Sequence, residues 1–180
     1  NLHRAAHSIP MIMRQPGVTQ SGVRSQLMVS GLDVYSTILE HVGLDGADKA
    51  ISSRSLMPIL SGADLSDWGD DVVCSEQEET RVIRTPKWAY FKRFEGAGTR
   101  FENELFDVEN DRDETVNLAA DPQYRDVVAE LDAKLIAFFK TYADPKADLW
   151  HGGAPIQHSE RTKLWQEAWG DDWQPVYTYR

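Results

Sequence analysis

The feature that most limits the fold is a long helical pattern near the C-terminus, DPQYRDVVAELDAKLIAFFKTY at residues 121–142. Asp121 is placed to cap the helix, and Pro122 occupies the first helical position. The apolar side chains recur at helical spacing and form one stripe: Val127, Val128, Leu131, Leu135, Phe138 and Phe139. Because such a stripe must be buried against a neighbour, the elements before the helix have to supply an apolar face.

Strand patterns precede this helix and can supply that face. The candidates are VVCSEQ at 72–77, RVIRTPKWAYFKRF at 81–94 and ENELFDV at 102–108. In the second candidate, side-chain alternation puts Trp88 and Tyr90 on one face and Ala89 and Phe91 on the other. We therefore expect a small antiparallel sheet that packs one face on the long helix, an α+β arrangement.

The first third of the chain has a different pattern. SIPMIMRQPG at 8–17 predicts a short buried strand that ends at a Pro-Gly turn, and VSGLDVYSTILEHVGL at 29–44 predicts a helix that Gly43 ends. SRSLMPILSG at 53–62 predicts a short apolar turn that Pro58 breaks. A buried strand usually has neighbours on both sides, and the sequence offers no partner of similar character. This indicates a missing N-terminal portion.

Charge and hydropathy exclude several classes of partner. The 180 residues contain 19 Lys and Arg against 29 Asp and Glu, a formal net charge of −10, so neither nucleic acid nor a membrane is expected to bind. No apolar run approaches the roughly 20 residues that a membrane-spanning helix needs. The first 17 residues lack the layout of a signal peptide, so we expect a periplasmic or secreted location only if a missing N-terminus carries one.

The segments resemble, in this order and at these spacings, the C-terminal portion of type I sulfatases of the alkaline phosphatase superfamily. The motifs are SIPMIMRQPG, VSGLDVYSTILEHVGL, SRSLMPILSG, RVIRTPKWAYFKRF and ELFDVENDRDETVNLAADPQ. The resemblance implies that residues 1–62 form the C-terminal end of the α/β catalytic domain. It further implies that residues 70–143 form an antiparallel subdomain with its helix, and we expect residues 144–180 to be an irregular Trp-rich tail.

The resemblance implies that catalysis uses a formylglycine, which is made from the Cys or Ser of a C/S-x-P-S/T-R motif. It also implies a divalent cation, usually calcium, held by Asp and Asn or His side chains. Neither the formylglycine motif nor the metal-binding motifs occur in this sequence. Cys74, in VVCSEQ, lacks the Pro and Arg of the motif and is predicted to be a buried strand residue. We therefore expect no catalytic residue and no metal ligand here. Calcium and formylglycine would belong to the missing portion, and the segment alone is predicted to be inactive.

Candidate substrate contacts lie at both ends of the chain. Four of the six Trp fall in the tail, where Trp150, His151 and His158 could contact the leaving group of a sulfate ester, or the aromatic side chains could only pack. At the N-terminus, the resemblance puts His3 near the sulfate pocket. His3 and His7 are four residues apart, which suits either a metal pair or two surface histidines.

The acidic stretch ENELFDVENDRDETVNLAADP at 102–122 could hold calcium or paired catalytic carboxylates. An EF-hand loop needs Gly at its sixth position, where this sequence has Arg112. We instead interpret the stretch as a polar turn after a strand that places Leu105 inward. The resemblance implies that Glu114 and Asn117 fold the chain back onto the sheet.

Three functions follow from these patterns. The first is the C-terminal segment of a sulfuric ester hydrolase, whose substrate is a sulfate ester such as a sulfated carbohydrate. The second is the corresponding segment of a phosphoric ester hydrolase of the same superfamily. The third is a free-standing carbohydrate- or anion-binding module that uses the aromatic tail.

Overall fold

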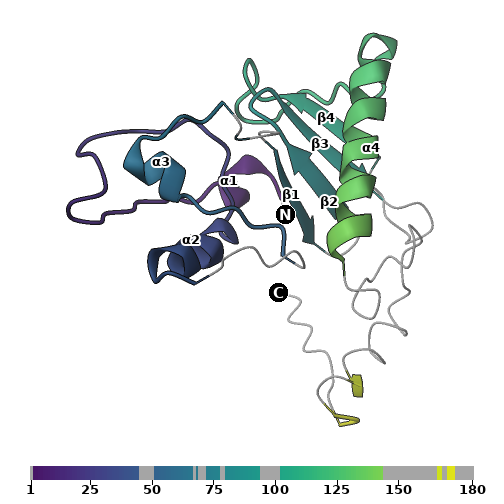
Figure 1. The fold of residues 1–180 in the computed structure, drawn as a ribbon. Coiled ribbons are helices and arrows are strands. Elements are labelled where there is room, and N and C mark those ends of the chain that lie inside the picture. Colours follow the sequence, from purple (N-terminus) through teal and green to yellow (C-terminus); the bar gives the residue numbers. More distant parts are fainter. Residues whose placement is uncertain are drawn as a thin grey trace.

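A computed structural model describes residues 2–44, 51–66, 68, 72–77, 80–93, 102–143, 166–167 and 170–172. Its elements, in chain order, are α1 (Arg4–His7), α2 (Asp33–His41), α3 (Met57–Ser61), β1 (Val73–Gln77), β2 (Thr80–Arg84), β3 (Trp88–Arg93), β4 (Glu104–Asp107), the 3₁₀ turn η1 (Pro122–Tyr124) and α4 (Arg125–Tyr142). Figure 1 shows the sheet and α4 on one side, with the three short helices on the other. The predicted α+β class is confirmed.

The sheet is a four-stranded antiparallel meander in the order β1-β2-β3-β4. RVIRTPKWAYFKRF was predicted as one strand, and this is wrong, because the segment forms a hairpin in which Ile83 pairs with Tyr90. The hydroxyl of Thr85 accepts a hydrogen bond from the Trp88 N–H at 2.8 Å, next to Pro86, which cannot donate to a ladder. The turn therefore lies inside the predicted strand.

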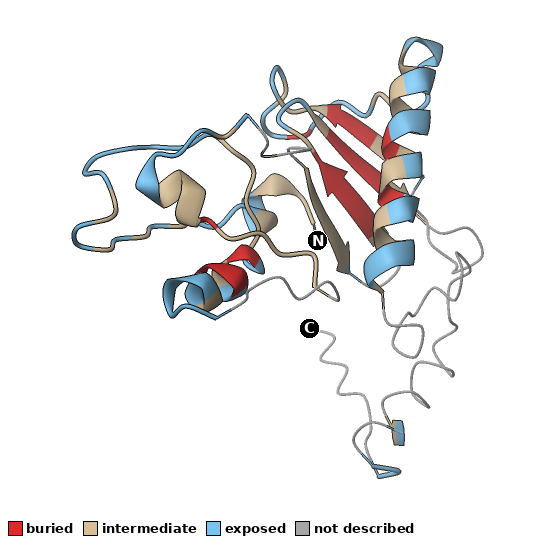
Figure 2. Ribbon diagram, viewed as in Figure 1, coloured by how far each residue is buried: buried red, intermediate tan, exposed pale blue. Residues whose placement is uncertain are grey.

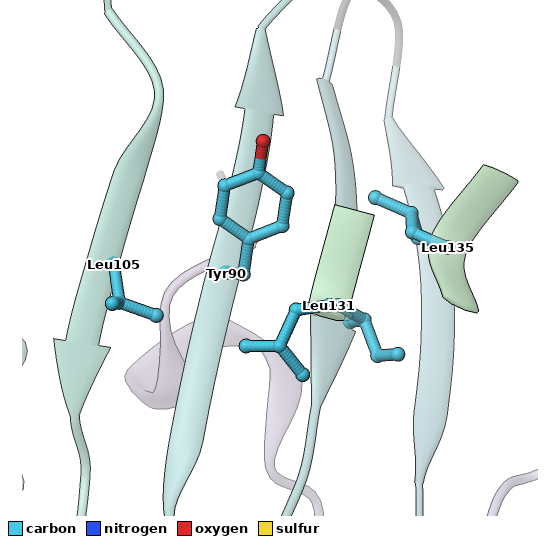
Figure 3. Packing of buried hydrophobic residues seen from close by; sticks show 5 residues of the cluster. Tyr90, Leu105, Leu131 and Leu135 are labelled. Atoms are coloured by element: carbon cyan, nitrogen blue, oxygen red, sulfur yellow. The ribbon is translucent and has the colours of Figure 1, made fainter. Parts of the chain in front are cut away.

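The predicted packing of the long helix on the sheet is confirmed. Ile83, Tyr90 and Leu105 on the sheet meet Leu131 and Leu135 on α4, and each of the five is at most 3% exposed (Figure 3). Asp121 caps the start as predicted, since its carboxylate accepts from the Gln123 N–H at 2.9 Å, although the first turn is 3₁₀.

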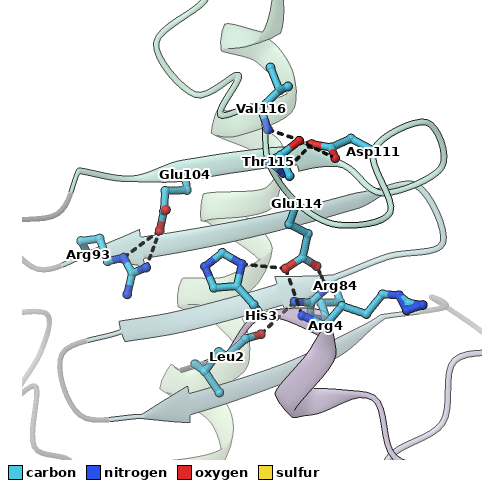
Figure 4. Close-up of polar contacts among 10 residues, drawn as sticks. All are labelled: Leu2, His3, Arg4, Arg84, Arg93, Glu104, Asp111, Glu114, Thr115 and Val116. Carbon is cyan, nitrogen blue, oxygen red and sulfur yellow. Dashed lines mark hydrogen bonds and ion pairs between the residues drawn. The ribbon is translucent and has the colours of Figure 1, made fainter.

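The opposite face of the sheet carries a second apolar cluster. Val82, Ala89, Phe91 and Phe106 are buried there, and Leu2 packs against them. Leu105 and Phe106 therefore face opposite sides of the sheet, as the alternation predicts. Figure 4 shows α1 in front of this face and α4 behind the sheet. The N-terminal segment thus covers the face that the long helix leaves open.

Two predictions for the first third of the chain are wrong. Residues 8–14 form no strand, and Figure 2 shows the stretch between α1 and α2 in the colours of exposed and intermediate residues. Ile9 and Ile12 are 73% and 91% exposed. A buried strand needs a neighbour to pair its backbone groups, and none lies beside this segment in the described part of the chain. SRSLMPILSG is not only a turn, because α3 forms with Pro58 in its first turn, where the missing N–H costs nothing.

Helix α2 forms where it was predicted and ends before Gly43, which has a φ of +76°. Its orientation differs from what the apolar spacing predicts. Leu32, Ile38 and Val42 are 51–60% exposed, and the buried positions are Asp33, Ser36 and Thr37. The Asp33 carboxylate accepts from the backbone N–H groups of Ser30 and Arg54, at 2.7 and 2.8 Å. Helix α2 is therefore held on the described structure by hydrogen bonds on its polar side.

Candidate functional site

The acidic stretch after β4 folds as a turn. The Asp111 carboxylate accepts from the backbone N–H groups of Val116 and Thr115, each at 2.8 Å, and these bonds lower the pKa of Asp111. The Asn117 side chain accepts from the Leu105 N–H at 3.0 Å, which ties the turn to the sheet. Among the described residues, no three His, Cys, Asp or Glu side chains are grouped so that they could hold a metal ion. The interpretation of a structural turn is confirmed.

Glu114 differs from the other acidic residues of this turn, because its carboxylate is buried on the face of the sheet opposite α4. The residue is 6% exposed and has a φ of +56°, a left-handed conformation that is uncommon outside glycine and asparagine. Its Oε1 accepts from the Arg84 Nη1 at 2.5 Å. Its Oε2 contacts the His3 Nδ1 at 2.8 Å and accepts from the Arg4 N–H at 3.0 Å (Figure 4).

The charge of Glu114 is stabilised by its partners. Burial by itself would raise the pKa of this carboxyl. The hydrogen bond and charge of Arg84, the Arg4 N–H and the His3 ring together outweigh burial and hold the pKa of Glu114 below its ordinary value. The group is therefore an ionised carboxylate at neutral pH.

Arg84 is the cationic half of the pair and was not predicted. It is 5% exposed on β2, and its Nη2 donates to the carbonyl oxygen of Leu2 at 2.8 Å. Its Nε is buried without a hydrogen-bond partner in the part of the chain that the structure describes. A sequence signal did exist, because Arg84 shares the apolar face of Val82 by strand alternation, and a buried arginine requires an acidic partner.

His3 lies in this cluster, with its ring centroid 4.8 Å from that of Phe91. The structure thus gives it a packing and hydrogen-bonding role on the sheet, and its predicted contact with substrate stays a prediction. His7, on the same helical turn, has its pKa lowered by burial and by the Arg84 charge, which Glu114 partly offsets. The described part of the chain does not bring His3 and His7 together with a third metal ligand.

Of the other residues named in the sequence analysis, the structure describes Cys74 but not the three tail residues. Trp150, His151 and His158 lie outside the described residues. Cys74 lies on β1, and burial raises the pKa of its thiol to about 12, so it is protonated at neutral pH. Cys74 therefore lies on a strand as predicted, but it is half-buried and not buried.

Comparison with known proteins assigns a family to this arrangement. Residues 2–141 match the family described as N-sulphoglucosamine sulphohydrolase, C-terminal. The match includes the N-terminal segment, the sheet and nearly all of α4. The chain belongs to this family.

Individual sulfatases support the same assignment. Arylsulfatase K of Mus musculus is 24% identical over an alignment of 190 positions, which covers 99% of this chain and 32% of that protein. The delta 4,5-hexuronate-2-O-sulfatase of Bacteroides thetaiotaomicron is 32% identical over 141 residues, which cover 71% of this chain and 27% of that protein. A solved 2-O GAG sulfatase is 31% identical with a TM-score of 0.51, over 63% of this chain and 25% of that chain.

The family and these likenesses show that the chain is the C-terminal portion of a sulfatase. It spans between a quarter and a third of the length of these curated relatives. Membership of this family implies a catalytic domain that contains calcium and formylglycine. The described residues of this chain contain no group suited to a metal, so they do not fit the calcium site.

Proposed function

We infer that this chain is the C-terminal portion of a sulfuric ester hydrolase that acts on a sulfated carbohydrate and borders its substrate cleft. The family match supports the reaction class, and the names of the relatives support the sugar. Formylglycine would supply the nucleophile and calcium would offset the sulfate charge, both from a catalytic domain. The division into residues 1–62, 70–143 and 144–180 stays a prediction.

One observation carries the role of this chain within such an enzyme. The Glu114 carboxylate and the Arg84 guanidinium join the segment Leu2–His7 to the sheet, across more than 80 residues of sequence. The resemblance assigns that segment to the catalytic domain and the sheet to the subdomain. The ion pair lies on the sheet side. Arg84 donates to the Leu2 carbonyl oxygen, and the Glu114 carboxylate contacts the His3 ring and accepts from the Arg4 N–H. These contacts fix the segment against the sheet and hold any side chain on it in one place.

The residues themselves have three tasks in this proposal. Phe91 and Phe106 give the segment an apolar base, with the His3 ring 4.8 and 5.6 Å from them. Glu114 and Arg84 set the position of the backbone. Trp150, His151 and His158, from the tail, would contact the leaving-group portion of the ester.

The experiment uses the full natural polypeptide that contains this chain. Its turnover is measured on nitrophenyl sulfate, on sulfated disaccharides and on a phenyl phosphonate ester. We expect the highest kcat/KM on a sulfated disaccharide. A kcat/KM that is highest on the phosphonate would favour the phosphoric ester hydrolase instead. Binding of sugar without turnover of any ester would favour a binding module.

A further inference from the structure

Glu114 adopts a backbone conformation that is rare for residues other than glycine. Its φ of +56° lies in the left-handed region, where the Cβ approaches the backbone, and glycine or asparagine would adopt it more easily. Such strain persists only where surrounding contacts impose it, and it gathers at functional sites. The contacts that impose it here are Arg84, His3 and Arg4.

These contacts fix three consecutive residues at the start of the described chain. Arg84 holds the Leu2 carbonyl oxygen at 2.8 Å. One oxygen of Glu114 holds both the His3 ring at 2.8 Å and the Arg4 N–H at 3.0 Å. A further bond, from the Ser8 N–H to the Arg4 carbonyl at 2.9 Å, closes the turn of α1. The backbone of Arg4 is therefore held on both its N–H and its C=O side.

The Arg4 side chain is left for another partner. Figure 4 shows it extending away from the Glu114 carboxylate that holds its N–H. The residue is half-buried, and within the described ranges its guanidinium forms neither a hydrogen bond nor an ion pair. A guanidinium presents its donors in a planar fork that suits carboxylate, sulfate and phosphate oxygens.

The charges around Arg4 favour an anion. Glu114 is the acid of this cluster, and the adjacent Arg84 offsets its charge. The pKa of His7 is lowered, so this residue is neutral at pH 7 and adds no charge to the cluster. In a chain with a net charge of −10, the cluster of Arg4, Arg84 and Glu114 carries a local excess of one positive charge.

We propose that Arg4 binds an anionic group of the substrate, and that Glu114 is the positioning residue that aims it. This rests on the proposed sulfatase function. The group is a sulfate or carboxylate oxyanion, which can be the sulfate that is cleaved or a second acidic group on the sugar.

The first test measures KM and kcat for Arg4→Ala and Arg4→Lys in the full natural polypeptide. The substrates are nitrophenyl sulfate, which has one anionic group, and a sulfated disaccharide with a uronate. A hydrogen bond to a charged group predicts that Arg4→Ala raises KM by about tenfold to a hundredfold, with Arg4→Lys in between. An effect on both substrates assigns the cleaved sulfate, and an effect on the disaccharide alone assigns the second group.

The control is Arg125→Ala, which removes an exposed arginine at the start of α4. It is expected to leave KM unchanged on both substrates. If Arg4→Ala also leaves both KM values unchanged, the proposal is overturned. An equal rise in KM for Arg125→Ala would also overturn it, because the effect would then be the general field of the protein.

The second test is a double-mutant cycle between Arg4→Ala and Glu114→Gln. If Glu114 acts through Arg4, Glu114→Gln raises KM on its own but adds little in the Arg4→Ala background. A purely structural Glu114 would give the same factor in both backgrounds, and that outcome overturns the positioning role.

A third measurement separates this proposal from the proposed function. Inorganic sulfate is added and the melting temperature is followed for wild type and Arg4→Ala. Sulfate is expected to raise the wild-type melting temperature and to raise that of Arg4→Ala less. If wild type turns over no ester but shows this difference, the sulfatase function fails and the anion site stands. Equal shifts in both proteins overturn the anion site, whatever the turnover.

Discussion

At the residue scale, the pair of Glu114 and Arg84 explains why the acidic turn has its shape. Both side chains are almost fully buried, at 1% and 7% exposure, and neither charge could remain there alone. Breaking a buried ion pair by removing one partner commonly costs about 3–5 kcal/mol, because the other charge is left uncompensated. The turn residues before Glu114 serve to place this carboxylate.

The pH dependence of stability tests this pair. The pKa of Glu114 is lowered in the folded state, so its contribution to stability is complete above the ordinary pKa of a glutamate, about 4.3, and is lost as pH falls through the lower folded value. We expect Glu114→Gln to reduce the unfolding free energy by about 3 kcal/mol at pH 7. The gap between variant and wild type should narrow below pH 4.3, as urea unfolding across pH would show. Parallel curves for the two proteins would contradict the ionised pair.

The tail residues give a second test at this scale. Trp150→Ala and His151→Ala in the full natural polypeptide are expected to lower kcat/KM by about tenfold, with little change in melting temperature. The reason is that an indole face and an imidazole donor suit a sugar sulfate. If the melting temperature falls by several degrees while the kinetics stay the same, the tail only packs and the substrate role is wrong.

Local residue roles could be read from the sequence, and long-range pairs could not. The Asp121 cap and the opposite facing of Leu105 and Phe106 depend on neighbours within a few positions, and both are confirmed. The pair of Arg84 and Glu114 spans 30 residues and depends on the hairpin turn at Pro86. Since that turn was predicted to be strand, the partner of Arg84 could not be identified.

At the scale of elements, the sheet with α4 is the well-packed unit of the described residues. The periodicity of the helix and the alternation of the strands each define one apolar face, and the two faces meet. Helix α2 shows the limit of this reasoning, because its apolar side is exposed and Asp33 is buried. Periodicity identifies a helix and its apolar face, but it does not say whether the described chain supplies the partner.

A pair of neighbouring positions on α4 tests the packing. Leu135 is fully buried and Ile136 is 51% exposed. Leu135→Ala is expected to lower the unfolding free energy by about 2–5 kcal/mol, since it leaves a cavity against the sheet. Ile136→Ala should change it by no more than about 0.5 kcal/mol. Urea unfolding followed by tryptophan fluorescence measures both, and equal losses would contradict the packing of α4 through Leu135.

At the scale of the whole molecule, several large apolar side chains in the N-terminal third are exposed. Ile9, Ile12, Ile38 and Val42 are each more than half exposed. Exposed apolar side chains mark an interface where they form one contiguous patch. The chain spans only a quarter to a third of the length of these relatives. In a protein of their length, further residues would cover these side chains.

The 180-residue chain by itself is therefore expected to self-associate through this surface. Sedimentation should show concentration-dependent assembly, and Ile12→Lys should weaken it, because a charge at the most exposed of these positions resists burial. Ile136→Lys, on the exposed side of α4, serves as the control. Slow hydrogen exchange across residues 9–13 in a demonstrated monomer would show that the segment is already covered.

The central claim is that the chain is a sulfatase C-terminal portion that lacks the catalytic groups. Turnover of nitrophenyl sulfate, measured with calcium for residues 1–180 alone and for the full natural polypeptide, tests it most directly. We expect turnover only from the full polypeptide, because no C/S-x-P-S/T-R motif lies in this sequence and Cys74 is a protonated thiol on a strand. Turnover by residues 1–180 that survives purification and Cys74→Ala would contradict the claim.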